Sequence, residues 1–269
     1  MKKITAIILS LVLVLSLFAG CGKKNDEKTI VIAASPTPHA EILEIAKQEL
    51  AKEGYTLEIK TFNDYVVPNT ATEDSEVDAN YFQHQPYLTT FNAEQGTHLV
   101  SVASIHYEPF GIYAGTKNSI AALASGDKIA IPNDGSNRAR ALLLLEAQGI
   151  ITLKEGVGVE ATVLDIVSYN VAVEIIEMEA AQIANVRDSV ALAVINGNYA
   201  LAAGLNAGKD AIATEDASSV AAQTYANILV VKEGNENSEK IQALIKALTS
   251  QAVKDFINST YEGAVVPIF

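Results

Sequence analysis

The sequence predicts an α/β fold with two lobes, each a mixed, largely parallel sheet flanked by helices, and a ligand bound in the cleft between them. Short apolar strands alternate with helices along residues 29–269, which is typical of α/β layers. Residues 75–84 and 188–199 also share one design, in which an acidic turn precedes a buried strand and then a group of polar and aromatic side chains. Ligands bind beyond the carboxyl ends of strands in open α/β sheets, so these two ends indicate two sheets facing one crevice.

The N-terminus has the features of an export signal. Lys2 and Lys3 precede an apolar run that ends near Phe18 and is too short for a spanning helix of about 20 residues. Residues 17–21 (LFAGC) resemble the lipobox of bacterial lipoproteins, in which the cysteine becomes the lipidated first residue, although Phe18 stands where leucine is usual. We therefore expect a signal peptide over residues 1–20, lipidation of Cys21, a flexible tether over residues 21–28, and an extracytoplasmic protein anchored to the cell membrane.

Composition excludes several classes of protein. Cys21 is the only cysteine, so the mature domain has no disulfide, no all-cysteine zinc site and no thiol nucleophile. The formal net charge is −13, and removal of Lys2 and Lys3 with the signal makes it −15. Such an acidic chain is not expected to bind nucleic acid or to contact membranes through a basic patch.

The elements follow from apolar spacing and from helix stop signals. Thr37 is suited to cap a helix that begins at Pro38, buries Ile42, Leu43, Ala46 and Leu50, and ends at Gly54. Further helices are expected over residues 137–148, 238–248 and 251–257. Strands are expected over residues 29–33, 56–62, 77–79, 100–104, 128–131, 171–176, 191–195 and 228–231.

Two arginines at the start of the helix near residue 137 are candidates for anion binding. A helix N-terminus already carries partial positive charge and normally favours acidic residues, so Arg138 and Arg140 are unusual there. An arginine at this position adds a bidentate donor to the free backbone N–H groups, which suits a carboxylate. Asn137 and Arg140 are three residues apart and share a helix face. We expect Arg140 to bind a ligand and Arg138 to lie on the surface.

Residues 80–87 (NYFQHQPY) combine aromatic rings with polar side chains. A wall of a ligand pocket uses both, because apolar faces enclose the ligand while a few polar groups orient it. A purely structural role for His84 is an equal alternative at this point.

Motifs of catalysis are missing from the sequence. It contains no HExxH, GxSxG, P-loop or GxGxxG motif, and its histidines at 39, 84, 98 and 106 do not share metal-ligand spacing on one helix. We expect no enzyme and no cofactor. Two rival classes remain open: a metal-binding lipoprotein, in which His39, His84 or His106 converge with carboxylates, and an extracytoplasmic enzyme with a nucleophile–base pair.

Several segments together resemble the methionine-binding lipoprotein family (NlpA/MetQ) of ABC importers. They are residues 78–88 (DANYFQHQPYL), 131–146 (IPNDGSNRARALLLLE), 193–206 (AVINGNYALAAGLN), 225–231 (YANILVV) and 263–269 (GAVVPIF). The resemblance implies a periplasmic-binding-protein fold, with residues 29–112 plus 227–269 in lobe 1 and residues 113–226 in lobe 2. The chain would cross near residues 111–115 and return near residues 225–228.

The same resemblance implies a binding site and partners. Rings of Phe82, His84 and Tyr87 would line a thioether slot, and Arg140 would grip the ligand carboxylate. The other implied ligand-binding residues are Tyr65, Asn137, Asn196 and Asn227. The ligand would be L-methionine, with D-methionine or a methionyl dipeptide as alternatives. The partners would be an ABC permease and its ATPase subunit, and the protein itself would be a monomer.

Overall fold

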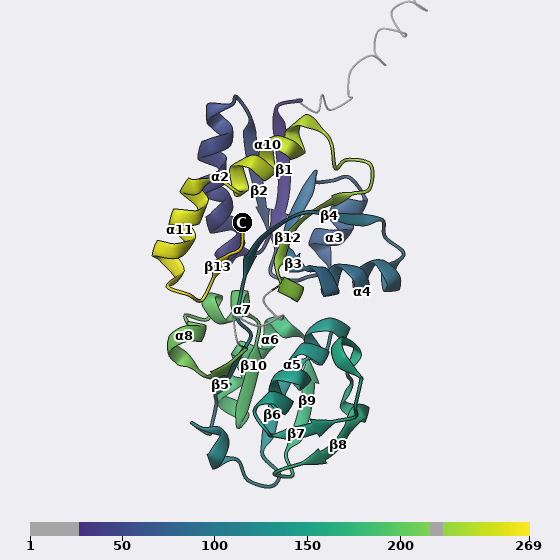
Figure 1. The fold of residues 1–269 in the computed structure, drawn as a ribbon, viewed down its shortest axis with the longest axis vertical. Coiled ribbons are helices and arrows are strands. Elements are labelled where there is room, and N and C mark those ends of the chain that lie inside the picture. The colour runs from purple at the N-terminus through teal and green to yellow at the C-terminus, as the bar shows by residue number, and fades with distance from the viewer. Residues whose placement is uncertain (1–26, 216–222) are drawn as a thin grey trace, which may run out of the picture.

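The protein folds into two α/β lobes, shown in Figure 1 by a computed structural model that describes residues 27–215 and 223–269. The described strands form a six-stranded sheet in the first lobe, in the order β13-β4-β12-β3-β1-β2, and a five-stranded sheet in the second, in the order β11-β5-β10-β6-β9. The predicted two-lobed fold with mixed sheets is confirmed. Within the described ranges, no helix combines the length and the apolar character needed to cross a membrane.

The first sheet is parallel only in its half β2-β1-β3. The other pairings are antiparallel, because β4 carries the chain out of this lobe and β12 brings it back. The strands are β1 (Thr29–Ala34), β2 (Thr56–Thr61), β3 (Ala79–His84), β4 (Leu99–Tyr107), β12 (Asn227–Lys232) and β13 (Val266–Pro267). Parallel pairing is therefore less extensive than expected.

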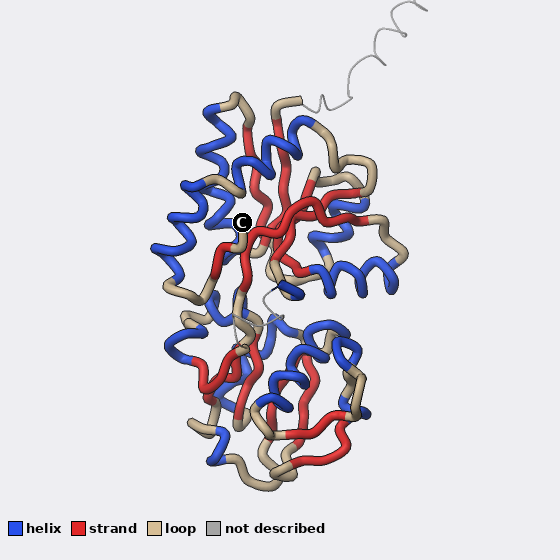
Figure 2. The backbone as a smooth tube through the Cα atoms, viewed as in Figure 1, coloured by secondary structure: helices blue, strands red, loops and turns tan. Residues whose placement is uncertain are grey.

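Helices cover both faces of the first sheet (Figure 2). Ile30 and Ile32 of β1 belong to one core cluster with residues of α2 (Glu41–Lys52), α10 (Glu239–Leu248) and α11 (Gln251–Tyr261). The alternate residues Val31 and Ala33 pack with Ala71 of α3 (Val67–Glu73), and α4 (Gln85–Gln95) packs on this side through Leu88. This alternation is the period of a strand buried on both faces.

The first helix begins later than predicted. Residues Pro36–Ala40 form a π-helical turn in which only Thr37 departs from helical backbone angles (φ −134°, ψ 142°), and α2 starts after it at Glu41. The predicted apolar stripe of α2 is buried. The turn places the His39 side chain in the protein interior, where its residue is 1% exposed.

The second sheet is parallel in β10-β6-β9 and antiparallel where β5 and β11 join it. Its strands are β5 (Gly111–Ala114), β6 (Lys128–Pro132), β9 (Glu174–Met178), β10 (Leu192–Ile195) and β11 (Ala211–Thr214). Its helices are α5 (Gly135–Ala147), α6 (Ala180–Val186), α7 (Gly197–Ala202) and α8 (Ala207–Asp210), beside a hairpin of β7 (Ile151–Leu153) and β8 (Ile166–Tyr169). The strand expected over residues 171–176 is thus displaced to Glu174–Met178.

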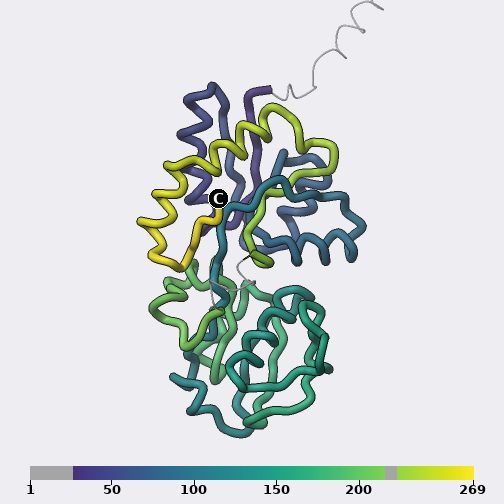
Figure 3. The backbone as a smooth tube through the Cα atoms, viewed as in Figure 1, coloured from purple at the N-terminus to yellow at the C-terminus, as the bar shows by residue number. Residues whose placement is uncertain are grey.

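The chain passes between the lobes twice. Residues 108–110, here called the first crossing, join β4 to β5, and the return segment joins β11 to β12 through described residues 215 and 223–226. The colours of Figure 3 show the beginning and the end of the described chain in the same lobe. The crossing expected near residues 111–115 lies earlier, because Gly111–Ala114 already form β5. The exact division of the lobes at residues 112 and 227 stays a prediction.

Candidate ligand-binding site

A small pocket lies between the lobes, and residues of both lobes line it. Its lining includes all eight residues expected to bind the ligand: Tyr65, Phe82, His84, Tyr87, Asn137, Arg140, Asn196 and Asn227. Gln83, Glu108, Gly197 and Asn198 complete the lining. Six stretches that lie apart in the sequence therefore meet in one cavity.

The first lobe supplies an aromatic wall. Phe82 lies in β3 and Tyr87 in the first turn of α4, and Tyr65 precedes α3. The centroid of the Tyr65 ring is 5.7 Å from that of Phe82 and 5.6 Å from that of Tyr87, which are distances of favourable ring packing. The Tyr87 hydroxyl donates to the backbone oxygen of Tyr65 at 3.0 Å, so the rings are fixed to one another.

Arg140 is buried and tightly bound to Glu215. Its Nε donates to Glu215 Oε1 at 2.8 Å and its Nη2 to Glu215 Oε2 at 2.6 Å, a bidentate pair. The guanidinium carbon lies 4.8 Å from the Phe110 ring centroid and 4.2 Å from that of Tyr225. Nη1 takes part in none of these hydrogen bonds. Burial alone would lower the pKa of Arg140, but Glu215 raises it above its ordinary value, so the guanidinium stays charged.

Asn137 connects the two lobes at the start of α5. Its side-chain N–H groups donate to Asp134, the capping residue of α5, at 3.0 and 3.1 Å. Its Oδ1 accepts from Asn196 at 2.8 Å and from His84 Nε2 at 3.1 Å. His84 Nδ1 accepts the backbone N–H of Tyr87, which fixes the imidazole as the Nε2–H tautomer. Burial, followed by the charge of Arg140, lowers the pKa of His84 to about 3, so this ring is neutral.

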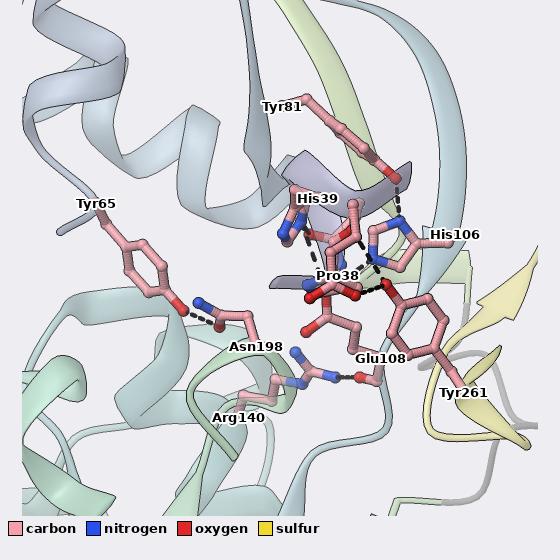
Figure 4. Close-up of polar contacts among 11 residues, drawn as sticks. Pro38, His39, Tyr65, Tyr81, His106, Glu108, Arg140, Asn198 and Tyr261 are labelled. Atoms are coloured by element: carbon pink, nitrogen blue, oxygen red, sulfur yellow. Dashed lines mark hydrogen bonds and ion pairs between the residues drawn. The ribbon is translucent and has the colours of Figure 1, made fainter. Parts of the chain in front are cut away.

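Glu108 is a pocket residue that the sequence did not single out. It lies in the first crossing and is 5% exposed. His106 Nε2 donates to its Oε1 at 2.7 Å, and the backbone N–H of Asn198 is a second donor. Burial raises the pKa of Glu108, because the charges of His39 and Arg140 and the Asn198 bond oppose desolvation only in part. Figure 4 shows the Glu108 side chain beside His39 and His106, with Arg140 bonded to its main chain.

Two side-chain amides, those of Asn227 and Asn196, lie in the same pocket as Arg140 and Glu108. Asn227 Oδ1 accepts from His39 Nε2 at 2.9 Å, and Asn227 also lines the pocket, where an amide can donate. Asn196 Oδ1 is buried and has no hydrogen-bond partner among the described residues, so it is an available acceptor. The pocket thus offers donors from Arg140 and Asn227 and acceptors from Glu108 and Asn196.

Direct bonds hold the lobes together around the pocket. The Tyr65 hydroxyl donates to Asn198 Oδ1 at 2.5 Å, and the Tyr199 hydroxyl donates to the backbone oxygen of Asn63 at 3.0 Å. With the His84–Asn137 bond, these contacts describe a closed arrangement of the two lobes.

Other candidates lie elsewhere. Arg138 does not line the pocket, and its Nη1 is 3.9 Å from Glu177 Oε2. Of the histidines in the metal-binding alternative, His39 and His106 converge with Glu108, whereas His84 bonds to Asn137. Cys21 and the signal peptide lie outside the described residues.

Gly197 is a further residue that sequence reasoning did not assign. A Cβ there would lie 2.6 Å from both Cβ and Oε2 of Glu108, so only glycine leaves the Glu108 carboxylate in place. The sequence predicted polar residues at 196–199, just after a strand. It did not indicate that position 197 must lack a side chain.

Comparisons with known proteins agree with this architecture. Residues 30–269 match the family model of the NlpA lipoproteins. The methionine-binding lipoprotein MetQ of Bacillus subtilis is 42% identical over 258 residues, which cover 93% of each chain. A solved structure from Ruminococcus gnavus is 61% identical with a TM-score of 0.89, covering 90% of this chain and 100% of the other. A nutrient-binding protein of Burkholderia cenocepacia, solved bound to methionine, is 41% identical with a TM-score of 0.85, covering 89% and 100%. The resemblance drawn from the sequence is confirmed, and the chain belongs to the NlpA lipoprotein family.

Proposed function

We propose that this protein is an extracytoplasmic solute-binding lipoprotein of an ABC importer and that its ligand is methionine. The observation that carries the proposal is the pairing of opposite charges in one enclosed pocket with an aromatic wall. Arg140 Nη2 donates to the backbone oxygen of Glu108 at 3.0 Å, so the cation and the second carboxylate are neighbours. Neighbouring charges of opposite sign suit the α-carboxylate and α-ammonium groups of an amino acid.

The proposed polar contacts use side chains that line the pocket. Arg140 Nη1 and the Asn227 amide would donate to the ligand carboxylate. Glu108 and Asn196 Oδ1 would accept from the ammonium. The methionine side chain would then extend toward Phe82, His84 and Tyr87, where sulfur–aromatic contacts contribute about 0.3–1.5 kcal/mol. Tyr65 and Asn137 would position these groups through the bonds described above.

Binding would couple to closure of the lobes. A ligand shifts the balance between open and closed forms only by its differential affinity for them. The proposed contacts come from Phe82, His84 and Tyr87 on one lobe and Arg140 and Asn196 on the other, so the closed form would bind more tightly. That form would dock on a membrane permease, whose ATPase partner drives release; we propose that the protein acts as a monomer and is not an enzyme.

Titration of ligand-stripped protein with a series of amino acids tests the ligand. Loss of the thioether end should cost about 2 kcal/mol, since each buried methylene-sized group contributes about 0.8 kcal/mol. Alanine and aminobutyrate should therefore bind about 30-fold more weakly than methionine in calorimetry. The Phe82→Ala variant should flatten this ranking. Tight binding of a sugar, with no binding of methionine, would disprove the proposed ligand.

The lipid anchor is tested separately. Cys21→Ser should abolish incorporation of labelled fatty acid and release the protein from the membrane fraction. Unchanged labelling in this variant would show that Cys21 is not the lipidated residue.

A further inference from the structure

Three buried side chains converge behind the wall of the pocket. His39, His106 and Glu108, here called the Glu108 cluster, bring their ligand atoms within 4.8 Å of one another (Figure 4). His106 Nε2 is 2.7 Å and His39 Nε2 is 3.6 Å from the same carboxylate oxygen, Glu108 Oε1. Only Glu108 also lines the ligand pocket, so the two histidines are not part of the site proposed for the amino acid.

We propose that the Glu108 cluster binds a divalent transition-metal ion of the zinc class. Two imidazole nitrogens and one carboxylate oxygen are a donor set that zinc uses, with a fourth position left open. Bond lengths of about 2.0–2.2 Å in tetrahedral geometry place neighbouring ligand atoms about 3.4 Å apart. His39 and Glu108 already have this separation. The hydrogen-bonded pair of His106 and Glu108 needs to open by less than about 1 Å, as the metal replaces the shared proton. The ligand atoms of the two histidines lie within 4.8 Å of one another and would have to move closer together.

The surroundings of His106 suit metal ligation, whereas His39 Nδ1 has no hydrogen-bond partner among the described residues. The Tyr81 hydroxyl bonds to Nδ1 of His106, the ring nitrogen that faces away from Glu108. A metal on Nε2 requires the ring proton on Nδ1, and a phenol hydroxyl remains bonded because it can accept as well as donate. Such a partner behind a ligating histidine fixes the ring and raises its basicity. Asn227 Oδ1 lies 2.9 Å from His39 Nε2, and a metal on this nitrogen would replace that hydrogen bond.

Charge near the cluster is also compatible with a cation. Arg140 is the nearest permanent positive charge to Glu108 in the pocket, and its bidentate pair with Glu215 neutralises it. The carboxylate of Glu108 then provides a negative ligand that the two neutral imidazoles do not.

The metal and the amino acid would compete. This consequence rests on the proposed function, because it requires the ligand ammonium to use Glu108. A carboxylate bound to zinc cannot form the same ion pair, so zinc should raise the apparent Kd for methionine.

The experiment uses ligand-stripped protein and two metal probes, Zn²⁺ by calorimetry and Co²⁺ by its visible absorption. One ion should bind per chain, with Co²⁺ bands typical of a nitrogen–oxygen site. His39→Gln and His106→Gln should each weaken Zn²⁺ binding at least tenfold. His98→Gln is the matched control, because the His98 side chain is 68% exposed and remote from the cluster. Circular dichroism and Tm establish that each variant is folded.

Two results would overturn the proposal. One is wild-type protein that binds no Zn²⁺ and gives no Co²⁺ bands, which needs no variant. The other is Zn²⁺ binding that keeps the wild-type affinity in folded His39→Gln and His106→Gln, because the ion would then lie outside the Glu108 cluster. Methionine binding without metal binding rejects the metal site alone, whereas metal binding without methionine binding rejects the proposed ligand alone.

Discussion

Glu108 and Glu215 are two buried carboxylates beside the same pocket, and their surroundings differ. Glu215 accepts both N–H groups of Arg140 and the hydroxyl of Tyr107 at 2.8 Å. Burial would raise its pKa, but the charge and bonds of Arg140 hold the pKa below its ordinary value. Glu108 instead faces His106 and His39, whose pKa values burial lowers to about 3 and about 4, so both rings are neutral.

The difference between the two carboxylates shows how a pocket that already contains the Arg140 guanidinium can also accept the ammonium group of a ligand. Glu215 is committed to Arg140, which it orients and neutralises. Glu108 has no permanent cation bonded to its carboxylate, and burial raises its pKa. A carboxylate in that state gains most from an incoming ammonium group, because the ligand supplies the charge that the protein does not.

The largest expected effect comes from removing the cation of the Glu215 pair. Arg140→Ala should weaken methionine binding about 100-fold, equivalent to about 2.7 kcal/mol, since it deletes a charge-assisted donor. It should also destabilise the fold by about 3–5 kcal/mol, because Glu215 is left buried and unpaired. Calorimetry and denaturant unfolding measure the two losses. Arg138→Ala is the control. A larger loss of binding in Arg138→Ala than in Arg140→Ala would mean that Arg138, not Arg140, binds the ligand carboxylate.

An intermediate effect is expected when Glu108 is displaced without changing its charge. Gly197→Ala places a Cβ 2.6 Å from Glu108 and should weaken methionine binding about 10- to 30-fold, as loss of one bond to a charged group predicts. Gly135→Ala is the matched control, because Gly135 also begins a helix but its Cβ would meet only Thr90 Cγ2 at 3.5 Å. Equal affinities for the two variants would mean that Glu108 does not contact the ligand.

The smallest effect is a pH dependence that separates the two carboxylates. Burial raises the pKa of Glu108, so below that pKa a proton must leave before the ammonium can pair. Methionine affinity should therefore fall as pH falls through it, by up to about tenfold per pH unit. The effect of Glu108 on folding has the opposite sign, since its raised pKa stabilises the fold at low pH and this contribution is lost as pH rises.

The measurement is Kd against pH for the wild type and for Glu108→Gln. The variant should bind more weakly at neutral pH and lose the acid dependence. Glu215 should contribute none of this slope, because its pKa is held low. An unchanged slope in Glu108→Gln would assign the titration to another group.

The aromatic wall was predictable because it depends on short-range spacing. Phe82 and His84 are two residues apart in a strand and therefore point to one face, and Tyr87 follows within one helical turn. The apolar stripe of α2 and the helix start near Arg140 were predictable for the same reason. The extended conformation of Thr37 also has a local cause, because a residue before proline is driven out of the α region.

The two carboxylates could not be found in this way. Glu215 lies 75 residues from Arg140 in the sequence, and the pair forms only when the return segment packs against α5. Glu108 lies in a segment too short for any periodicity. Its nearest signal was His106, two residues earlier on the same strand side, which sequence spacing alone does not distinguish from a core histidine.

The first crossing is only three residues long, and this has a mechanical consequence. Glu108 and Phe110 belong to the crossing, and Glu215 and Tyr225 belong to the return segment, yet all four surround Arg140. Of these four residues Glu108 also lines the pocket, so a segment that joins the lobes forms part of the candidate site. A small rotation about so short a connection would move the rims of the lobes much farther than the connection itself. Substitutions in the segments that join the lobes will therefore change ligand affinity and the movement of the lobes together.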